Sequence, residues 1–239
     1  MERVYRKQAV TRTPDTRYSL VAVHPFTYSP PPEPLVVLHQ DKDLLVIDKP
    51  TGLLSVPGRG EGLRDSAWSR ALAIHPLCQV VHRLDMATSG VLLFALRRKA
   101  EATMRAQFSD RTVEKWYLAR VLGRLAPSEG TIELPLAADS TQPPLQRVDV
   151  GGRPALTRWK VLGHDQDSTL VELRPLTGRS HQLRVHMAAL GHPILGDPLY
   201  GPGIALSAAP RLLLHAAALS VTHPYSGERL TFTAPVPFA

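Results

Sequence analysis

This sequence of 239 residues has few or none of the features that indicate a disulfide-bonded, membrane or secreted protein. Its single cysteine, Cys78, excludes an internal disulfide and fits a reducing compartment. No apolar run approaches the roughly 18 residues that span a bilayer, so no membrane partner is expected. The N-terminus has basic residues but no apolar core followed by a small-residue cleavage site. We therefore expect no secretory signal and a cytoplasmic location.

Acidic residues are also in deficit, 21 against 28 lysines and arginines, which gives a formal net charge of +7. A basic protein of this kind favours an anionic partner, with nucleic acid ahead of a membrane because no amphipathic anchor stands out. Charge alone leaves RNA enzymes, ribosome-associated binding modules and DNA-binding proteins open. The length suffices for one large domain or two small subdomains with a shared core.

The first 34 residues differ in composition from the rest of the chain. They are basic and contain six prolines, so they cannot build a core and are expected to form a solvated arm. Residues 35–239 are predicted to form one domain. Its expected elements are a hairpin of 35–38 and 44–47, helices at 66–74, 97–108 and 180–190, and strands at 115–121, 155–162, 169–175, 211–219 and 229–232. Asp65 and Ser180 are the expected N-caps of the first and third helices, and Leu183, Met187 and Leu190 should form a core-facing stripe on the third.

The stretch from Val80 to Leu96 is the most informative part of the sequence. Its apolar run from Val91 predicts a buried strand, which would hold the preceding polar loop rigidly. Within that loop Asp85 has cationic neighbours, and the hydroxyls of Thr88 and Ser89 are expected to donate toward its carboxylate. A carboxylate so placed stays ionised and available as a nucleophile or base. Taken alone, the loop favours an Asx-turn over a catalytic aspartate, because aspartate is common in loops.

The residues His82-Arg83-Leu84-Asp85 followed by Thr88-Ser89-Gly90 resemble the HRLD-x-x-TSG motif of the RluA-type pseudouridine synthases, which isomerise uridine in RNA. Three other stretches are similar to motifs of the same family: Lys49-Pro50-Thr51-Gly52, Lys115-Trp116-Tyr117, and the long segment from Leu176 to Gly201. The resemblance covers roughly residues 35–238.

The resemblance implies an α+β fold with a mixed, mostly antiparallel sheet and helices around a central RNA-binding cleft. It implies Asp85 as the nucleophile or base, paired with Arg179, and Tyr117 stacked on the base. Because the isomerisation neither oxidises nor transfers a group, no cofactor and no metal are expected. The expected substrate-binding residues are Arg83, which would fill the gap left by an extruded base, Leu183 against the uracil, Lys49 at a phosphate, and His82.

Features of the matching segments point to one branch of the family. There is no room before Leu35 for the S4 RNA-binding module that many members of the superfamily carry. This resembles the compact branch, which modifies the tRNA anticodon stem-loop and a 23S rRNA hairpin. We expect a monomer that acts on one or both of these RNAs and not on DNA. A branch that acts on rRNA alone is the alternative.

Two other classes remain as competing hypotheses. The histidines His82, His181 and His186 lie near Asp85 in the motifs, which raises a metal-dependent hydrolase. However, His181 and His186 are five residues apart, about 140° around a helix, which is poor for joint ligation. A non-catalytic RNA- or ribosome-binding protein would also fit the charge, but would leave the spacing around Asp85 without a purpose.

Overall fold

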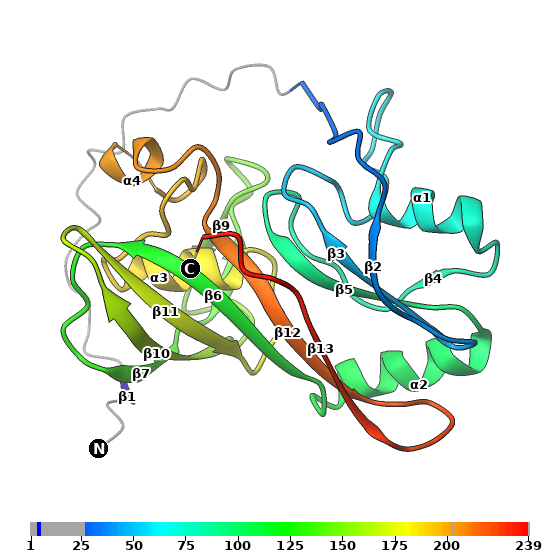
Figure 1. The fold of residues 1–239 in the computed structure, drawn as a ribbon. Helices are drawn as coiled ribbons and strands as arrows, with labels where there is room; N and C mark the ends of the chain where they lie inside the picture. The colour runs from blue at the N-terminus through cyan, green and yellow to red at the C-terminus, as the bar shows by residue number, and fades with distance from the viewer. Residues whose placement is uncertain (1–3, 6–26, 202, 239) are drawn as a thin grey trace.

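The computed structural model describes residues 4–5, 27–201 and 203–238 (Figure 1). One sheet of eleven strands forms the body of this part of the chain, in the order β1-β7-β10-β11-β6-β12-β5-β3-β2, with β13 beside β12 and β4 beside β5. A second sheet holds β8 and β9. The pairs β1–β7 and β5–β12 are parallel and the other pairs are antiparallel. The predicted α+β fold with a mixed, mostly antiparallel sheet is confirmed.

Four helices interrupt the run of strands in this part of the chain. In chain order the elements are β1 (Val4–Tyr5), β2 (Val36–Gln40), β3 (Leu44–Lys49), α1 (Ala67–Ile74), β4 (Gln79–Val80), β5 (Ser89–Ala95), α2 (Arg98–Ser109), β6 (Glu114–Leu122), β7 (Glu129–Glu133), β8 (Leu136–Ala138), β9 (Gln146–Val148), β10 (Leu156–His164), β11 (Ser168–Pro175), α3 (Gln182–Ala189), α4 (Ile204–Ser207), β12 (Leu214–Thr222) and β13 (Arg229–Thr233). None of these helices is both long and apolar enough to cross a membrane.

Strands β3 and β5 are covered on both faces, which explains their near-continuous apolar sequences. In β3, Leu45 and Ile47 pack with α1 residues, whereas Leu44 and Val46 pack with Met104 of α2. Successive side chains of a strand point to opposite faces, so α1 and α2 lie on opposite sides of this half of the sheet. Every residue of β5 is buried, as predicted. The Asp85 loop thus leads into one of the most rigid strands.

The other half of the sheet is covered by α3. Leu183 and Met187 of this helix are buried in a core with residues of β6, β10, β11 and β12, and Leu190 packs against it. These three positions form the stripe expected from the sequence. In Figure 1 α3 lies over β6 and β11, apart from α1 and α2, so the strands β6, β12 and β5 join two separately covered halves.

Several local expectations need correction. Ser66 caps α1 through a reciprocal bond with Ser69, whereas Asp65, expected as the cap, pairs with Arg70. The start of α3 is capped by His181 and not by Ser180. Strand β1 lies within the arm that was expected to be irregular, and the hydroxyl of Tyr28 donates to the Asp65 carbonyl. Residues 1–3 and 6–26 of the arm lie outside the described residues.

Candidate active site

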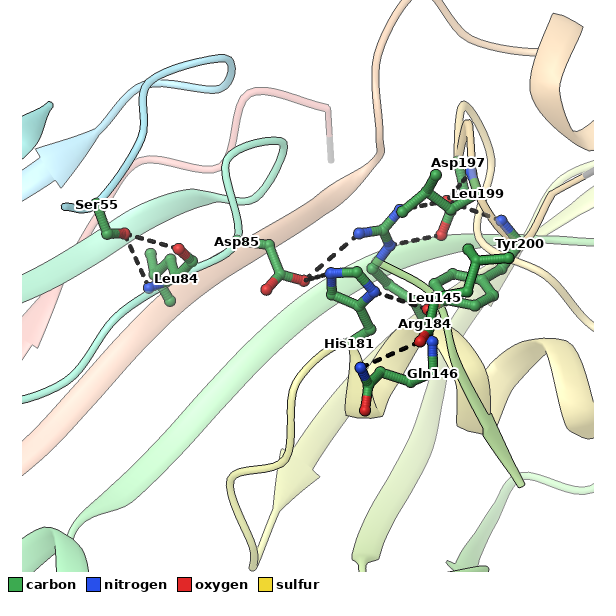
Figure 2. Close-up of polar contacts among 10 residues, drawn as sticks. All are labelled: Ser55, Leu84, Asp85, Leu145, Gln146, His181, Arg184, Asp197, Leu199 and Tyr200. Atoms are coloured by element: carbon green, nitrogen blue, oxygen red, sulfur yellow. Dashed lines mark hydrogen bonds and ion pairs between the residues drawn. The ribbon is translucent and has the colours of Figure 1, made fainter. Parts of the chain in front are cut away.

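Asp85 lies in the loop between β4 and β5, and its side chain is 28% exposed. The loop folds back on itself, since the Thr88 amide donates to the Asp85 carbonyl at 3.1 Å. No side-chain hydrogen bond ties the Asp85 carboxylate to its own loop in the described chain. An Asx-turn therefore does not account for this aspartate, and its carboxylate faces other elements (Figure 2).

The loop that follows β3 clamps the Asp85 loop from one side. The Ser55 hydroxyl donates to the Leu84 carbonyl at 2.7 Å and accepts the Leu84 amide at 3.0 Å, as Figure 2 shows. Thr51 Oγ1 donates to the Ala87 carbonyl at 2.8 Å. These bonds fix the backbone on both sides of Asp85. The two sequence motifs are therefore one structural unit, in which the first positions the second.

Lys49 belongs to this clamp. The expectation that it faces a phosphate is wrong. Its side chain is fully buried, and its ammonium donates to the carbonyls of Pro50, Leu53 and Met86 at 2.7, 2.8 and 3.1 Å. Burial lowers the pKa of Lys49 to about 7, against the attraction of Asp85 and then Asp48. A short apolar run before the lysine already indicated a strand end, but the burial of its amine depends on the tertiary fold.

The Thr-Ser-Gly part of the motif joins the loop to β12. Ser89 Oγ lies 2.9 Å from His215 Nδ1 and accepts a bond from Arg211 at 3.1 Å. The expectation that this hydroxyl faces the loop carboxylate is therefore wrong. Gly90 has φ +109°, and a Cβ on it would come within 2.3 Å of the Ala216 carbonyl oxygen. Only glycine allows β5 and β12 to approach this closely.

Arg184 is the cation that faces Asp85. Its Nη1 lies 3.5 Å from Asp85 Oδ2, and its other nitrogens form a bidentate pair with Asp197 at 2.8 and 2.6 Å. The Arg184 side chain is 4% exposed and that of Asp197 is fully buried. Burial alone would lower the pKa of Arg184, but its hydrogen bonds with Asp197 and the charges of Asp197 and Asp85 together raise it. Asp85 thus faces a fixed positive charge.

The expected ion pair between Arg179 and Asp85 is wrong. Arg179 precedes α3, and its Nε donates to the Pro154 carbonyl at 3.0 Å. Arg184 lies within the helix and points toward Asp85 in Figure 2. Both arginines belong to the same sequence motif, and the sequence held one signal in favour of Arg184. Arg184 follows Leu183, a core position of the predicted helix. The packing of the helix therefore also fixes the direction of the Arg184 side chain.

His181 is a second group beside Asp85, and the sequence had raised it only as a candidate metal ligand. Its Nε2 lies 3.9 Å from Asp85 Oδ2, and its Nδ1 lies 2.7 Å from the Tyr200 hydroxyl. Burial lowers the pKa of His181, against the attraction of Asp85. The ring is therefore neutral at neutral pH.

Tyr117 lies on β6, where the two halves of the sheet meet. Its ring packs against both the core under α3 and the core under α1. Burial raises the pKa of Tyr117, and the Asp85 charge raises it further, so the phenol stays protonated. Leu183, 7% exposed, belongs to the core that Tyr117 touches. Tyr117 and Leu183, the two side chains predicted to face the uracil, thus lie on neighbouring elements, β6 and α3.

His82 and Arg83 occupy opposite environments. His82 Nε2 accepts the Leu93 amide at 2.9 Å, and its ring stacks on Phe108 at 4.7 Å. Burial, with a smaller effect of Lys115, lowers the pKa of His82 to about 3. His82 is therefore a neutral structural residue, and its expected place in substrate binding is not supported. Arg83 is exposed beside Asp85.

The histidines do not assemble as metal ligands around Asp85. His186 contacts Thr157 Oγ1 through Nδ1 and the Leu134 carbonyl through Nε2, so neither nitrogen is directed at His181. Among the described residues, the one group of three or more side chains spaced for a metal ion is Asp41, Asp43 and His223, which includes no residue of the Asp85 site. The geometry gives the hydrolase hypothesis no support.

Comparison with known proteins bears on the same segments. Residues 43–189 match the model of a family described as RNA pseudouridylate synthase. The chain is 52% identical over 214 residues to the dual-specificity RNA pseudouridine synthase RluA of Escherichia coli O6:H1, which covers 88% of this chain and 98% of the relative. The Haemophilus influenzae protein of the same name is 49% identical over 210 residues, 87% of this chain and 96% of that one.

The fold is shared with solved structures as well. Human RNA Pseudouridylate Synthase Domain Containing 1 superposes with a TM-score of 0.73 at 31% identity, over 86% of this chain and 84% of that chain. Human RNA Pseudouridylate Synthase Domain Containing 4 gives 0.68 at 28% identity, over 85% and 89%.

Proposed function

The chain belongs to the RNA pseudouridylate synthases, isomerases of uridine in RNA, and from this premise we propose that Asp85 is its nucleophile and that Arg184 holds it. The observation that carries the proposal is the Arg184 guanidinium, fixed by Asp197 and directed at Asp85 Oδ2. A neighbouring cation keeps a carboxylate ionised and oriented. No hydrogen bond from the described residues reaches Oδ1, which leaves that oxygen free to react.

The overall reaction needs little beyond such a carboxylate. The bond from N1 to C1′ breaks, a bond from C5 to C1′ forms, and one proton leaves C5 while N1 gains one. Nothing is oxidised, so no cofactor or metal is proposed. Tyr117 is the proposed stacking surface for the uracil, with Leu183 on the other side. Because its phenol stays protonated, Tyr117 is also placed to exchange a proton with the base.

Access to a uridine requires its extrusion from the surrounding stack, at a cost of about a few kcal/mol that is least in an unpaired loop. Arg83 is the proposed residue that fills the vacated gap, since it is exposed and adjacent to Asp85. Its proposed role is supported by position alone.

Three arginines from separate segments form the proposed contact with the RNA backbone. Burial and then the charges of Arg153 and Arg111 lower the pKa of Arg179, which indicates that the three cations are close. None of the three has an ion pair with a carboxylate among the described residues. Unneutralised cations of this kind bind phosphates independently of sequence. The proposed role of Arg179 is therefore to bind the RNA backbone, in place of the catalytic role expected from the sequence.

The proposed substrates are the tRNA anticodon stem-loop and a 23S rRNA hairpin. The support is the dual-specificity name of the relatives, which align over nearly their whole length. A monomer that acts on RNA and not on DNA, in the cytoplasm where both RNAs occur, completes the proposal. An enzyme restricted to rRNA is the second candidate.

The test is isomerisation of uridine in total tRNA and 23S rRNA, located by carbodiimide labelling and primer extension. Wild type is compared with Asp85→Asn and with Asp167→Asn, an exposed loop aspartate as matched control. We expect product from wild type and Asp167→Asn, none from Asp85→Asn, and equal RNA binding by all three. Activity that survives Asp85→Asn would refute the nucleophile. RNA binding without any product would favour a non-catalytic binding protein.

A further inference from the structure

His181 occupies an unusual position at the start of α3. Its backbone has φ +53°, one of two such values among the described residues other than glycine. A side chain in the left-handed region is disfavoured unless its surroundings stabilise it, and such outliers cluster at functional sites. Here the ring is held by the Tyr200 hydroxyl at 2.7 Å and by an edge contact with the Tyr200 ring at 5.6 Å.

The Tyr200 hydroxyl determines which nitrogen of His181 carries the proton. It accepts the backbone N–H of Gln146 at 2.8 Å, so its own proton is free to be donated. When this proton is donated to the other partner of the hydroxyl, His181 Nδ1 at 2.7 Å, that nitrogen accepts it. In the neutral ring the proton then resides on Nε2. This N–H is the one that faces Asp85 Oδ2 at 3.9 Å.

The arrangement in Figure 2 is asymmetric about the carboxylate. Arg184 and His181 both approach Oδ2, one as a cation and one as a neutral donor. At 3.9 Å the contact from His181 is longer than a direct hydrogen bond, and a shift of about 1 Å would bring Nε2 within hydrogen-bond distance of Oδ2. Two donors on one oxygen fix the rotation of the carboxyl group more tightly than Arg184 alone.

We propose that His181, held as its Nε2–H tautomer by Tyr200, is a positioning residue that orients Asp85 through Oδ2 and thereby directs Oδ1 at the nucleotide. This inference rests on the proposed role of Asp85 as nucleophile. The charged and titratable groups that face the ring are Asp85 and Arg83 from the β4–β5 loop, Arg184 from α3, and Asp197 with Tyr200 from the segment after α3. A second full charge on His181 beside Arg184 would weaken the nucleophile.

Two amide substitutions separate positioning from mere packing. Glutamine places its N–H₂ where Nε2 lies and keeps a donor toward Asp85. Asparagine places its polar atoms where Nδ1 lies and keeps the Tyr200 contact, and it also tolerates the left-handed backbone better. The positioning role therefore predicts that His181→Gln is the more active variant. A structural role predicts the reverse order.

The experiment measures kcat and KM on a uridine-containing stem-loop from about pH 5 to 8 for wild type, both amide variants and His181→Ala. His192→Gln is the control, because the His192 ring has one hydrogen-bond partner among the described residues, the Leu122 carbonyl. We expect His181→Ala and His181→Asn to lose about 10- to 100-fold in kcat with little change in KM, because misplacing a reacting group costs about that much. His181→Gln should retain more activity and lose the acidic limb of the pH profile.

Tyr200→Phe gives an independent check. A hydrogen bond donated to the unprotonated Nδ1 stabilises the neutral ring, so its loss raises the pKa of His181 and moves the acidic limb of kcat to higher pH. The inference would be overturned if His181→Asn were as active as His181→Gln or more active. It would also be overturned if the pH profiles of kcat for wild type and Tyr200→Phe coincided. An inactive wild type would instead refute the proposed function, so the two failures are distinct.

Discussion

Arg184 and Asp197 form a bidentate ion pair with N···O distances of 2.8 and 2.6 Å, in which neither side chain is more than 4% exposed. Asp197 also accepts the amides of Leu199 and Tyr200 through Oδ1. The carboxylate is therefore fixed before it meets the guanidinium, and the fixed guanidinium in turn faces Asp85.

Replacement of Arg184 is expected to lower the stability of the fold and the activity for two different reasons. Arg184→Met leaves the Asp197 charge buried without its partner, which costs about 3–5 kcal/mol in the free energy of unfolding. The double variant with Asp197→Asn should recover part of that stability and none of the activity, because Asp85 still lacks its cation. Urea unfolding and the isomerisation assay measure the two effects. An active double variant would show that the pair is only structural.

Arg179→Met is the matched comparison for Arg184→Met. Within the described part of the chain the Arg179 side chain makes one hydrogen bond, to a backbone carbonyl, so its loss should change the free energy of unfolding by less than about 1 kcal/mol. Catalysis should show a raised KM with an unchanged kcat, and the salt dependence of RNA binding should weaken by about one phosphate contact. A loss of kcat as large as that of Arg184→Met would show that Arg179 acts in catalysis.

The buried Lys49 predicts a rise of stability with pH. Its pKa is about 7 in the folded chain and near 10.5 in the unfolded chain, so between these values the unfolded chain binds more protons. The free energy of unfolding then rises by up to about 1.4 kcal/mol per pH unit from this group. Below pH 7 both states hold the proton and the contribution is constant.

Chemical unfolding of wild type and Lys49→Met, from about pH 7 to about pH 8.5, measures this difference in slope. Lys115, whose pKa is lowered by burial to about 8, adds a slope of the same sign to both proteins. Burial raises the pKa of Cys78 to about 12, which gives the opposite slope from the top of this window upward, equally in both proteins. Equal slopes in the two proteins would contradict the prediction.

Gly90→Ala tests the close approach of β5 and β12. The new methyl group would meet the Ala216 carbonyl oxygen at 2.3 Å in a backbone with φ +109°, so we expect a loss of about 3 kcal/mol or more. Gly163→Ala is the control, because nothing lies within 4 Å of a Cβ there. Thermal unfolding compares them. A small effect at Gly90 would mean that the two strands separate easily.

Local sequence patterns predicted the elements that carry the site. The buried run of β5 and the Leu183–Met187 stripe of α3 follow from periodicity, and these elements place Asp85 and the helix that faces it. The family resemblance supplied Asp85 and Tyr117. Position within a motif could not decide which of two arginines faces Asp85, because that depends on where the helix begins and how it packs.

The errors at Lys49 and His82 share one physical cause. Both are polar residues in a motif, and polarity suggested contact with substrate. The fold instead buries the Lys49 amine among three carbonyls and gives the His82 ring a backbone amide. Such bonds join residues up to 37 positions apart, so no local pattern reveals them. His181 was considered only as a metal ligand, because its contact with Asp85 also spans distant segments.

The contact between Ser89 and His215 joins positions 126 residues apart, at the parallel pairing of β5 with β12. During synthesis the Asp85 loop is made long before the strand that secures it. A ribosome-bound chain that ends before β12 would carry Asp85, Tyr117 and Arg184 without this anchor. The growing chain therefore cannot secure the Asp85 loop in this way until β12 has been made and has paired with β5.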